Sequence, residues 1–386
     1  MKKEEKKSLY LGIVWLVIAS SGVVTIEPAP VDIGIMFLFV MGLFYSRISI
    51  RRSILSLYTL LFLFVFSNVF SIFIAHDKIL GVKYMTITLY LILSWLFFIS
   101  LVNNYGEKAV KTIFSGYTVA ALFSSVLGIL SYFKLIPSYE QFLKFERATG
   151  LFKDPNVYGP FMIPVALYAL VRLEVTRGVH RIYWLSVLLL TSIGVLLSYS
   201  RAAWGSYVLA IGVYAGIRFF INPSLKKVKR WVLFLGIIAI LAIALMRIPH
   251  LHQDITNRLA YQNYDNQRFA NQGKALEIAI KSPLGIGPGQ SEKVLDISTH
   301  NSYLRVWIEN GYLGLICYVI FIVSSIFRGL KYALKTKNAI YAMATAALMA
   351  IVLNSFVVDV VHWRHFWLIL AVPWFPPGTV AEKTHQ

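Results

Sequence analysis

The stretch ILSLYTLLFLFVFSNVFSIFI, residues Ile54 to Ile74, runs for 21 residues without a charged side chain. An α-helix rises about 1.5 Å per residue, so about 20 apolar residues cross the roughly 30 Å of hydrocarbon in a bilayer. Runs of similar length recur along the chain, which is 58% apolar and only 14% charged. A soluble globular surface needs more charge than this. The pattern therefore predicts an all-α, polytopic integral membrane protein.

We expect about 12 transmembrane helices in a single membrane domain, residues 1–386. The basic N-terminus with its apolar run resembles a signal peptide, but many spans follow it, so we interpret it as an uncleaved first helix. The first six predicted spans are Leu9 to Val24, Ile33 to Tyr45, Ile54 to Ile74, Val82 to Val102, Val110 to Phe133, and Val157 to Val171. The other six are Tyr183 to Tyr199, Ala202 to Phe220, Val232 to Met246, Tyr303 to Phe327, Ala339 to Val358, and Phe366 to Phe375.

Lysine and arginine outnumber aspartate and glutamate by 37 to 18, which gives a net charge of +19. Such a charge can indicate nucleic-acid binding, but here the basic residues mostly occupy short segments between apolar runs. That placement is typical of lipid head-group anchors and topology signals, so we expect a lipid bilayer and no nucleic acid as partner. By the positive-inside rule the basic loops face the cytoplasm, and an even number of spans puts both termini there. These loops carry Lys2, Lys3, Lys6, Lys7, Arg47, Arg51, Arg52, Lys108, Lys111, Arg172, Arg177, Arg181, Lys226, Lys227, Lys229, Arg230, Arg328, Lys331, Lys335 and Lys337.

Two of the extracytoplasmic loops are long. The smaller covers residues 134–156, and the larger covers residues 247–302, which is too long for a simple connector. Within the larger loop, RFANQGKALEIAIK at Arg268 to Lys281 has the pattern of an amphipathic helix. The following PLGIGPG ends it, because proline and glycine do not continue a helix. We therefore expect a partly helical outer loop.

The strongest local pattern is HNSYLRVWIENGYLG, residues His300 to Gly314, where the larger outer loop enters a membrane helix. A lone histidine is more often a structural hydrogen-bonding residue than a catalyst. The pair Gly311 and Gly314 would by itself indicate only close helix packing.

This segment resembles the histidine signature of the O-antigen ligase and polymerase superfamily, membrane glycosyltransferases that use polyprenyl-diphosphate-linked glycans. Three further segments agree with the family in the same order. They are RATGLFKDPNVYG at Arg147 to Gly159, LSYSRAAW at Leu197 to Trp204, and NQRFANQGKALEIAIKSPLGIGPG at Asn266 to Gly289. With the repeated spans, the resemblance covers most of the chain and implies a site on the outer face of a bacterial inner membrane.

Arg201 lies at the outer end of a span, against the positive-inside trend and without an acidic neighbour in sequence. A snorkelling anchor is the usual role of an arginine there. For Arg268 the ordinary interpretation is a solvated charge paired with Asp265 or Glu277. The resemblance instead implies that Arg201 and Arg268 are functional. Because a guanidinium stays charged and matches phosphate oxygens with a planar fork, we expect the two to clamp a lipid diphosphate.

A second set of candidates surrounds these residues as substrate contacts. Arg147, Lys153 and Asn156 extend the outer basic surface, although a turn closed by Asp-Pro-Asn is an equal alternative. Asn301 follows the candidate catalytic histidine. Glu309 lies inside the predicted helix, where a carboxylate is normally paired, so it could orient a basic side chain.

Missing motifs also limit the mechanism. The sequence has no D-x-D pair for a sugar-nucleotide metal, no P-loop glycine run and no G-x-S-x-G elbow. The single cysteine, Cys317, lies in an apolar run and excludes a disulfide framework or a thiolate cluster. We therefore expect no metal and no cofactor. In the implied reaction His300 is the general base or orients the acceptor hydroxyl, and the arginines stabilise the departing diphosphate.

The resemblance implies transfer of a glycan from undecaprenyl diphosphate, with inversion at the anomeric carbon. A glycolipid acceptor such as lipid A core would make the enzyme an O-antigen ligase, which we favour slightly. A second lipid-linked repeat as the glycan acceptor would make it an O-antigen or exopolysaccharide polymerase. A lipid-linked oligosaccharide transporter is the alternative from another class. Transporters usually place ionisable residues near mid-membrane, whereas this chain gathers them on one face.

Overall fold

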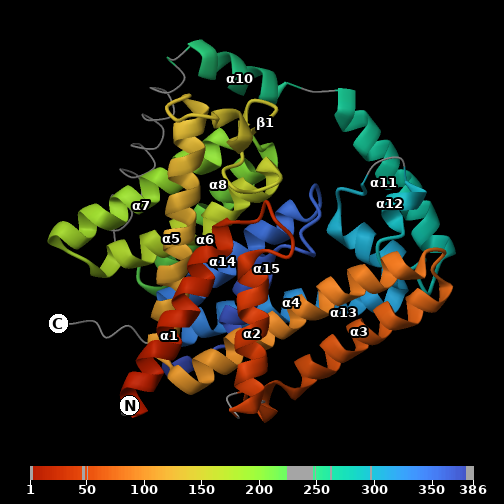
Figure 1. Cartoon of the computed structure of the whole chain (residues 1–386), viewed down its shortest axis with the longest axis horizontal. Coiled ribbons are helices and arrows are strands. Elements are labelled where there is room, and N and C mark those ends of the chain that lie inside the picture. The colour runs from red at the N-terminus through yellow and green to blue at the C-terminus, as the bar shows by residue number, and fades with distance from the viewer. Residues whose placement is uncertain are drawn as a thin grey trace.

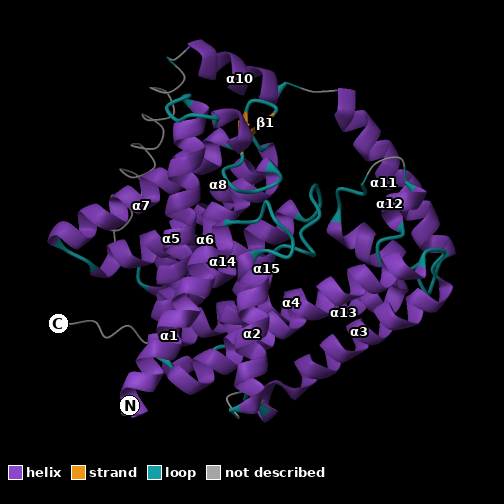
Figure 2. Ribbon diagram, in the orientation of Figure 1, coloured by secondary structure: helices purple, strands orange, loops and turns teal. Residues whose placement is uncertain are grey.

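The computed structural model describes residues 3–45, 48–49, 51–223, 247, 249–260, 263–295 and 298–379. Within these residues nearly all regular structure is helical, and the single strand pair is a two-residue hairpin of β1 (Leu143–Lys144) and β2 (Arg147–Ala148) (Figures 1 and 2). The helices are α1 (Lys3–Ala19), α2 (Pro30–Phe44), α3 (Leu55–Ile74), α4 (Lys78–Tyr105), α5 (Glu107–Tyr132), α6 (Pro155–Val175), α7 (Gly178–Leu197), α8 (Arg201–Ile221), α10 (Pro249–Leu259), α11 (Asn263–Lys281), α12 (Ser291–Val294), α13 (Ser302–Thr336), α14 (Ala339–Asn354) and α15 (Arg364–Ala371). Short 3-10 turns occur at Ser20–Gly22, Arg52–Ile54, Tyr139–Phe142, Val372–Trp374 and Pro377–Thr379.

Seven helices in the described residues are long and apolar enough to cross a bilayer. They are Arg52–Ile74, α4, α5, α6, α7, α8 and α13, and three shorter apolar helices occupy Lys7–Gly22, Pro30–Phe44 and Ala339–Asn354. The chain is thus an all-α membrane protein, as its apolar runs predicted. Ten of the expected spans coincide with these ten helices, whereas the full number of twelve is not confirmed. The expected span Val232 to Met246 lies outside the described residues.

The last expected span differs from the prediction. In place of Phe366 to Phe375 the structure has α15, whose eight residues extend only about 12 Å, too short to cross a bilayer as a helix. A 3-10 turn then continues the chain to Trp374. The carbonyls of Pro373 and Trp374 accept hydrogen bonds from Arg328 and Arg51, at 2.9 and 3.0 Å. This segment therefore ends beside two arginines that the charge pattern assigns to the cytoplasmic side.

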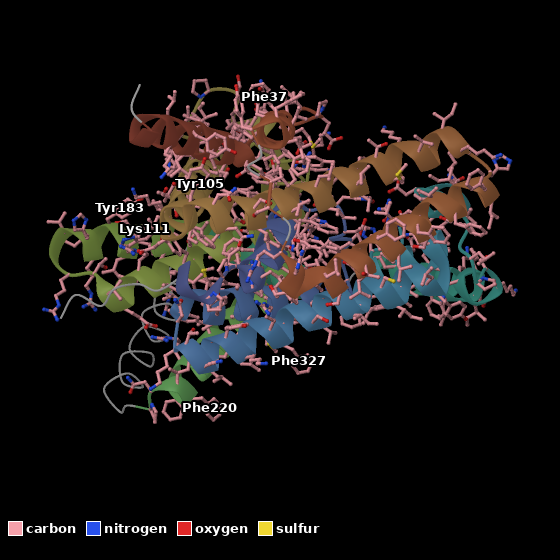
Figure 3. All side chains as sticks on the ribbon, turned by 90° about the horizontal axis from the view of Figure 1, so that it is seen from below. Phe37, Tyr105, Lys111, Tyr183, Phe220 and Phe327 are labelled. Atoms are coloured by element: carbon pink, nitrogen blue, oxygen red, sulfur yellow. The ribbon has the colours of Figure 1, made fainter. Side chains whose placement is uncertain are left out.

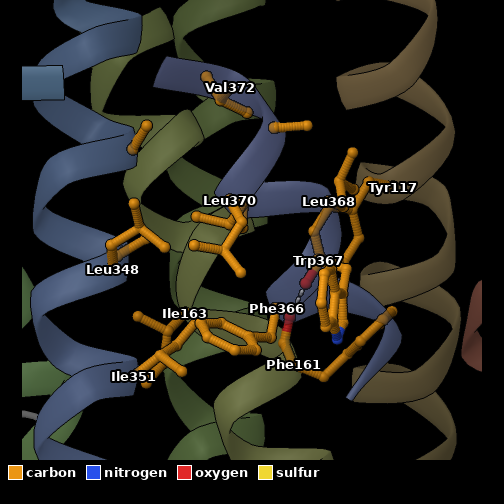
Figure 4. Close-up of a cluster of buried hydrophobic side chains, with 14 of the residues drawn as sticks. Tyr117, Phe161, Ile163, Leu348, Ile351, Phe366, Trp367, Leu368, Leu370 and Val372 are labelled. Carbon is orange, nitrogen blue, oxygen red and sulfur yellow. Dashed lines mark hydrogen bonds between the residues drawn. The ribbon is translucent and has the colours of Figure 1, made fainter. Parts of the chain in front are cut away.

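The bundle is apolar both outside and inside. Phe37, Phe220 and Phe327 lie on its outer surface (Figure 3), which suits contact with lipid. Inside, Phe366 and Trp367 of α15 are buried among side chains of α5, α6 and α14 (Figure 4). Because α15 is surrounded by other helices and not by lipid, it does not need the length of a membrane-spanning helix.

The long loop, residues 247–302, contains α10, α11 and α12, and α10 lies at the same end of the bundle as the β1 hairpin (Figure 1). The predicted amphipathic helix is confirmed as the main part of α11, which ends at Lys281 before PLGIGPG. Ala275 and Ala279 of α11 pack against Ile308 of α13. The long loop is therefore folded onto the first part of α13.

Candidate active site

A cavity of about 660 Å³ opens among the segments that the sequence singled out. Five of the predicted site residues line this cavity, which we call the His300 cavity: Arg147, Asn156, Arg201, Arg268 and His300. Its other lining residues are Phe145, Glu146, Tyr199, Ser200, Ala202, Asn257, Arg258, Gln267 and Val358. Residues as far apart in sequence as 145 and 358 thus meet at one site.

Three helices begin at this cavity. Asn156 is in the first turn of α6, Ser200 is the N-cap of α8, and His300 directly precedes Asn301, the N-cap of α13. Each N-cap side chain accepts a backbone hydrogen bond: Asp154 from Asn156 N at 2.7 Å, Ser200 from Ala203 N at 3.3 Å, and Asn301 from Tyr303 N at 3.0 Å. Helix N-termini carry partial positive charge, so the three reinforce the arginines in favouring an anion.

Arg147 fixes one wall of the cavity. Its Nε donates to the carbonyl of Ser198 at 2.8 Å, and its Nη2 donates to Oδ1 of Asn156 at 2.8 Å. The side chain is only 8% exposed. Arg147 therefore joins the hairpin to the end of α7 and the start of α6, and it brings Asn156 into the site.

His300 is half-buried and holds a left-handed backbone conformation, with φ of 46°. Burial lowers the pKa of its imidazole below the ordinary 6.5, and the nearby positive charge of Arg268 lowers it further. Asp154 and Asp359 act in the opposite direction but do not reverse the shift. The neutral, proton-accepting form of His300 therefore predominates at neutral pH.

The two predicted clamp residues come from different elements. Arg201 is the first residue of α8, and Arg268 belongs to α11. The Nη2 of Arg268 donates a hydrogen bond to the carbonyl of Val357, next to the lining residue Val358. The loop after α14 thereby holds α11 against the cavity.

Residues 186–319 match the family model described as O-antigen ligase. This segment of the chain is thus similar to O-antigen ligases, in agreement with the resemblance of its sequence motifs. A comparison with curated proteins found no match.

The O-antigen ligase segment contains Arg201, Arg268 and His300. Arg147 and Asn156 precede it, so the His300 cavity is completed by residues outside the matched segment. Arg258 of α10 also lines the cavity, but sequence reasoning did not select it. A single arginine in a polar loop gives no signal in sequence, because only the placement of α10 brings it to the site.

Three predicted substrate contacts lie away from the cavity lining. Lys153 forms an ion pair with Glu27 at 3.0 Å, and the side chain of Asn301 accepts backbone hydrogen bonds as a helix cap. Glu309 is buried and forms an ion pair with Arg305 at 3.2 Å. Glu309 is thus paired with a basic side chain, and its role in the site stays a prediction. The alternative of a turn at Asp154 is also confirmed, because this residue caps α6.

Arg305 is the centre of a buried network that sequence reasoning missed. It pairs with Glu309 on its own helix, with Glu292 at 3.2 Å and with Asp359, and its guanidinium lies 5.0 Å from the ring centre of Tyr84. Burial alone would raise the pKa of Asp359, but Arg305, His362 and the backbone N–H of Val361 together outweigh it, so the net pKa is lowered. The network joins α4, the long loop, α13 and the loop after α14.

The two motif glycines differ in their roles. Gly311 has φ of 68°, and a Cβ there would lie 2.3 Å from the carbonyl oxygen of Pro283. Gly311 marks a break in α13, and the backbone of PLGIGPG packs into this break. There the backbone N–H of Ile286 donates a hydrogen bond of 2.8 Å to the carbonyl of Ile308. The expectation of helix packing was therefore wrong for Gly311, where a loop makes the close contact. Gly314 does lie against another helix, because a Cβ there would be 3.0 Å from Oγ of Ser67 in α3.

No group of three or more histidine, cysteine, aspartate or glutamate side chains suited to a metal occurs among the residues that the structure describes. The charged lining of the His300 cavity consists of four arginines, Glu146 and the titratable His300. This donor set suits phosphate oxygens better than a hard cation. Independence from metal remains a prediction.

Proposed function

We propose that the protein is an O-antigen ligase that transfers a glycan from undecaprenyl diphosphate to a hydroxyl of lipid A core. The observation that carries this proposal is the His300 cavity, in which one histidine faces four arginines and three helix N-termini. A large positive cavity suits a diphosphate, and a neutral imidazole beside it suits proton transfer. The family match supports the same class of reaction.

In the proposed step an acceptor hydroxyl oxygen attacks the anomeric carbon of the donor glycan. The new glycosidic bond forms as the bond from that carbon to the phosphate oxygen breaks, and the diphosphate leaves with the electron pair. His300 takes the proton of the hydroxyl. Attack opposite the leaving group inverts the anomeric configuration.

Arg201 and Arg268 stabilise the negative charge that grows on the departing diphosphate. They line the same cavity as His300, and Arg201 also lies at the N-terminus of a 21-residue helix. Donors placed where charge develops lower the barrier without moving during the reaction. Arg258 adds a third guanidinium from α10, whereas Arg147 mainly positions Asn156.

The proposal places the cavity on the extracytoplasmic face of a bacterial inner membrane, with both termini in the cytoplasm. The charge pattern supports this orientation, since the outer loops around the cavity alternate with the lysine- and arginine-rich loops. The end of α15 beside Arg51 and Arg328 agrees with it.

The test is transfer by the purified full-length chain in lipid nanodiscs. The donor is an undecaprenyl-diphosphate-linked glycan, and the acceptor is lipid A core or, in a second reaction, a lipid-linked repeat. We expect a covalent glycan–lipid A core product and release of undecaprenyl diphosphate. Extension of the lipid-linked repeat alone would identify a polymerase instead. Movement of intact donor across a vesicle bilayer, without a covalent product, would identify a transporter and reject the proposal.

A further inference from the structure

A second cavity, of about 210 Å³, shares the N-terminus of α6 as a wall with the His300 cavity. Asp154 lines this second cavity, whereas Asn156, two residues later, lines the His300 cavity. The exposed ion pair of Glu27 and Lys153 lies at its rim. Its walls come from α1, α2, α4, α5, α6 and α15, so the space extends from the outer loops into the helix bundle.

The charges around the second cavity are compensated. Arg364 donates two hydrogen bonds, each of 2.6 Å, to the carboxylate of Asp32, and Lys153 pairs with Glu27 at 3.0 Å. Burial lowers the pKa of His362 to about 4, so this imidazole is neutral at physiological pH. The second cavity therefore suits an uncharged ligand, in contrast to the His300 cavity with its four arginines.

Buried polar atoms in the wall of this cavity lack a hydrogen-bond partner in the part of the chain that the structure describes. The ring of His365 is only 5% exposed and stacks on Trp363 at 5.1 Å, with Phe161 edge-on at 5.6 Å. Its Nε2 has no hydrogen bond within the described part of the chain, and neither has Oγ of Ser21, which lines the same cavity. Buried polar atoms are almost always satisfied, so these two indicate a bound molecule that can hydrogen-bond.

The side chains in the wall of the second cavity restrict the chemical class of the bound molecule further. Aromatic rings of Tyr117, Phe152, Phe161 and Trp363 line the cavity beside these polar atoms. A sugar ring has apolar C–H faces that pack on aromatic rings and a rim of hydroxyls that hydrogen-bond. A lipid acyl chain could not form hydrogen bonds with His365 and Ser21. A diphosphate would carry negative charge into a cavity whose lining has no net positive charge.

We propose that the second cavity binds an uncharged sugar ring of the acceptor glycan, alongside the donor diphosphate in the His300 cavity. The assignment to the acceptor rests on the proposed transferase function, whereas binding of the sugar does not require turnover. The shared wall at Asp154 and Asn156 would hold acceptor and donor side by side. Binding an inner ring here would leave the terminal hydroxyl free to reach His300.

Two conservative variants remove the unsatisfied atoms without disturbing the fold. His365→Phe keeps the stacked ring but removes both nitrogens, and Ser21→Ala removes one hydroxyl. Because neither atom has a protein partner, the melting temperature without ligand should not fall. A third variant, Ser21→Phe, fills the cavity from its wall. The matched controls are His76→Phe, at an exposed histidine that lines neither cavity, and Ser20→Ala, whose hydroxyl instead donates to Val17 O at 2.7 Å.

The measurement is binding of two probes to the full chain in nanodiscs without donor: core oligosaccharide freed of lipid A, and a free O-antigen repeat unit. We expect the dissociation constant of one probe to rise about 3- to 10-fold in His365→Phe and in Ser21→Ala, and more in Ser21→Phe. The affinity for undecaprenyl diphosphate should not change, and the two controls should bind both probes normally. In turnover assays the acceptor KM should rise while kcat stays near wild type.

Two results would overturn the proposal. One is binding of neither probe by the wild type, and the other is unchanged binding in all three cavity variants, which would leave ordered water as the occupant. These results can be distinguished from a failure of the proposed function. Binding that the variants weaken, in a protein that transfers no glycan, would retain the sugar site and reject the transferase.

Discussion

Tyr199 and His300 both adopt a left-handed backbone conformation with φ of 46°, and both line the His300 cavity. Histidine tolerates this conformation better than tyrosine does, but both carry a steric cost. Such residues persist where the surrounding structure holds them, commonly at functional sites. Tyr199 is held by a 2.7 Å hydrogen bond between its hydroxyl and that of Tyr132. Two residues with a strained backbone conformation thus lie in the wall of the same cavity.

Replacing His300 with asparagine should separate chemistry from folding. Asparagine also tolerates the left-handed conformation, so the variant should insert and melt like the wild type. It cannot take a proton from the acceptor, so transfer should fall about 10²- to 10⁴-fold. The assay is initial-rate transfer with both substrates saturating, with His76→Asn as the exposed control. Near-normal turnover would reduce His300 to a structural residue.

Lysine in place of Arg201 or Arg268 should impair transfer although the charge is retained. An ammonium cannot contact two phosphate oxygens as a planar guanidinium does, so we expect roughly a 10- to 100-fold loss. Affinity for undecaprenyl diphosphate should fall in parallel, whereas His300→Asn should still bind it. Arg181→Lys, at an exposed position away from the cavity, serves as control. Full activity in both clamp variants would instead favour simple electrostatic attraction.

The pH profile should report the lowered pKa of His300. Because burial and Arg268 hold that pKa below 6.5, the imidazole stays neutral at more acidic pH, and the acid limb of kcat/KM should have its midpoint below 6.5. Arg268→Gln removes one cause of the shift, so the midpoint of its residual activity should move to higher pH. Arg181→Gln should leave the midpoint unchanged. A shift to lower pH in Arg268→Gln would contradict the assignment.

Transfer should persist in excess EDTA, and added Mg²⁺ or Mn²⁺ should not raise the rate substantially. The reason is the lining of the His300 cavity, where guanidinium groups and helix N-termini supply the positive charge that a divalent cation supplies in other glycosyltransferases. The measurement compares initial rates with and without chelator at constant ionic strength. Abolition by EDTA with rescue by a divalent ion would show that the leaving-group stabilisation has been assigned to the wrong groups.

Topology can be read from accessible thiols. In a Cys317→Ser background, a cysteine at the exposed position 253 of α10 should react with an impermeant thiol reagent in intact spheroplasts. A cysteine at the exposed position 335, in the basic last turn of α13, should react only after lysis. The reverse pattern would put the His300 cavity in the cytoplasm and exclude a lipid-linked donor presented on the outer face.

Most helices could be predicted because a long apolar run in a sequence usually forms a membrane-spanning helix. The error at α15 shows the limit of that signal. The apolar residues from Phe366 onward look like part of a span in sequence, whereas their surroundings are other helices. Only tertiary packing distinguishes a short enclosed helix from a short lipid-facing one.

Five residues of the His300 cavity could be indicated by sequence motifs although they come from separate segments, whereas the network around Arg305 could not. Arg305 lies inside the histidine motif, yet of its three acidic partners only Glu309 is a sequence neighbour. Glu292 and Asp359 come from separate segments. Gly311 was likewise interpreted as a helix contact, because spacing alone does not reveal a backbone with positive φ.

The positive lining of the His300 cavity also affects the end of the proposed reaction cycle. Before transfer the terminal phosphate of the carrier is esterified to the sugar, and after transfer it is free and carries additional negative charge. Four arginines and three helix N-termini would therefore hold the spent carrier more tightly than the loaded one. Charge that speeds bond breaking would thus slow product release, and turnover would depend on how quickly the vacated carrier is removed.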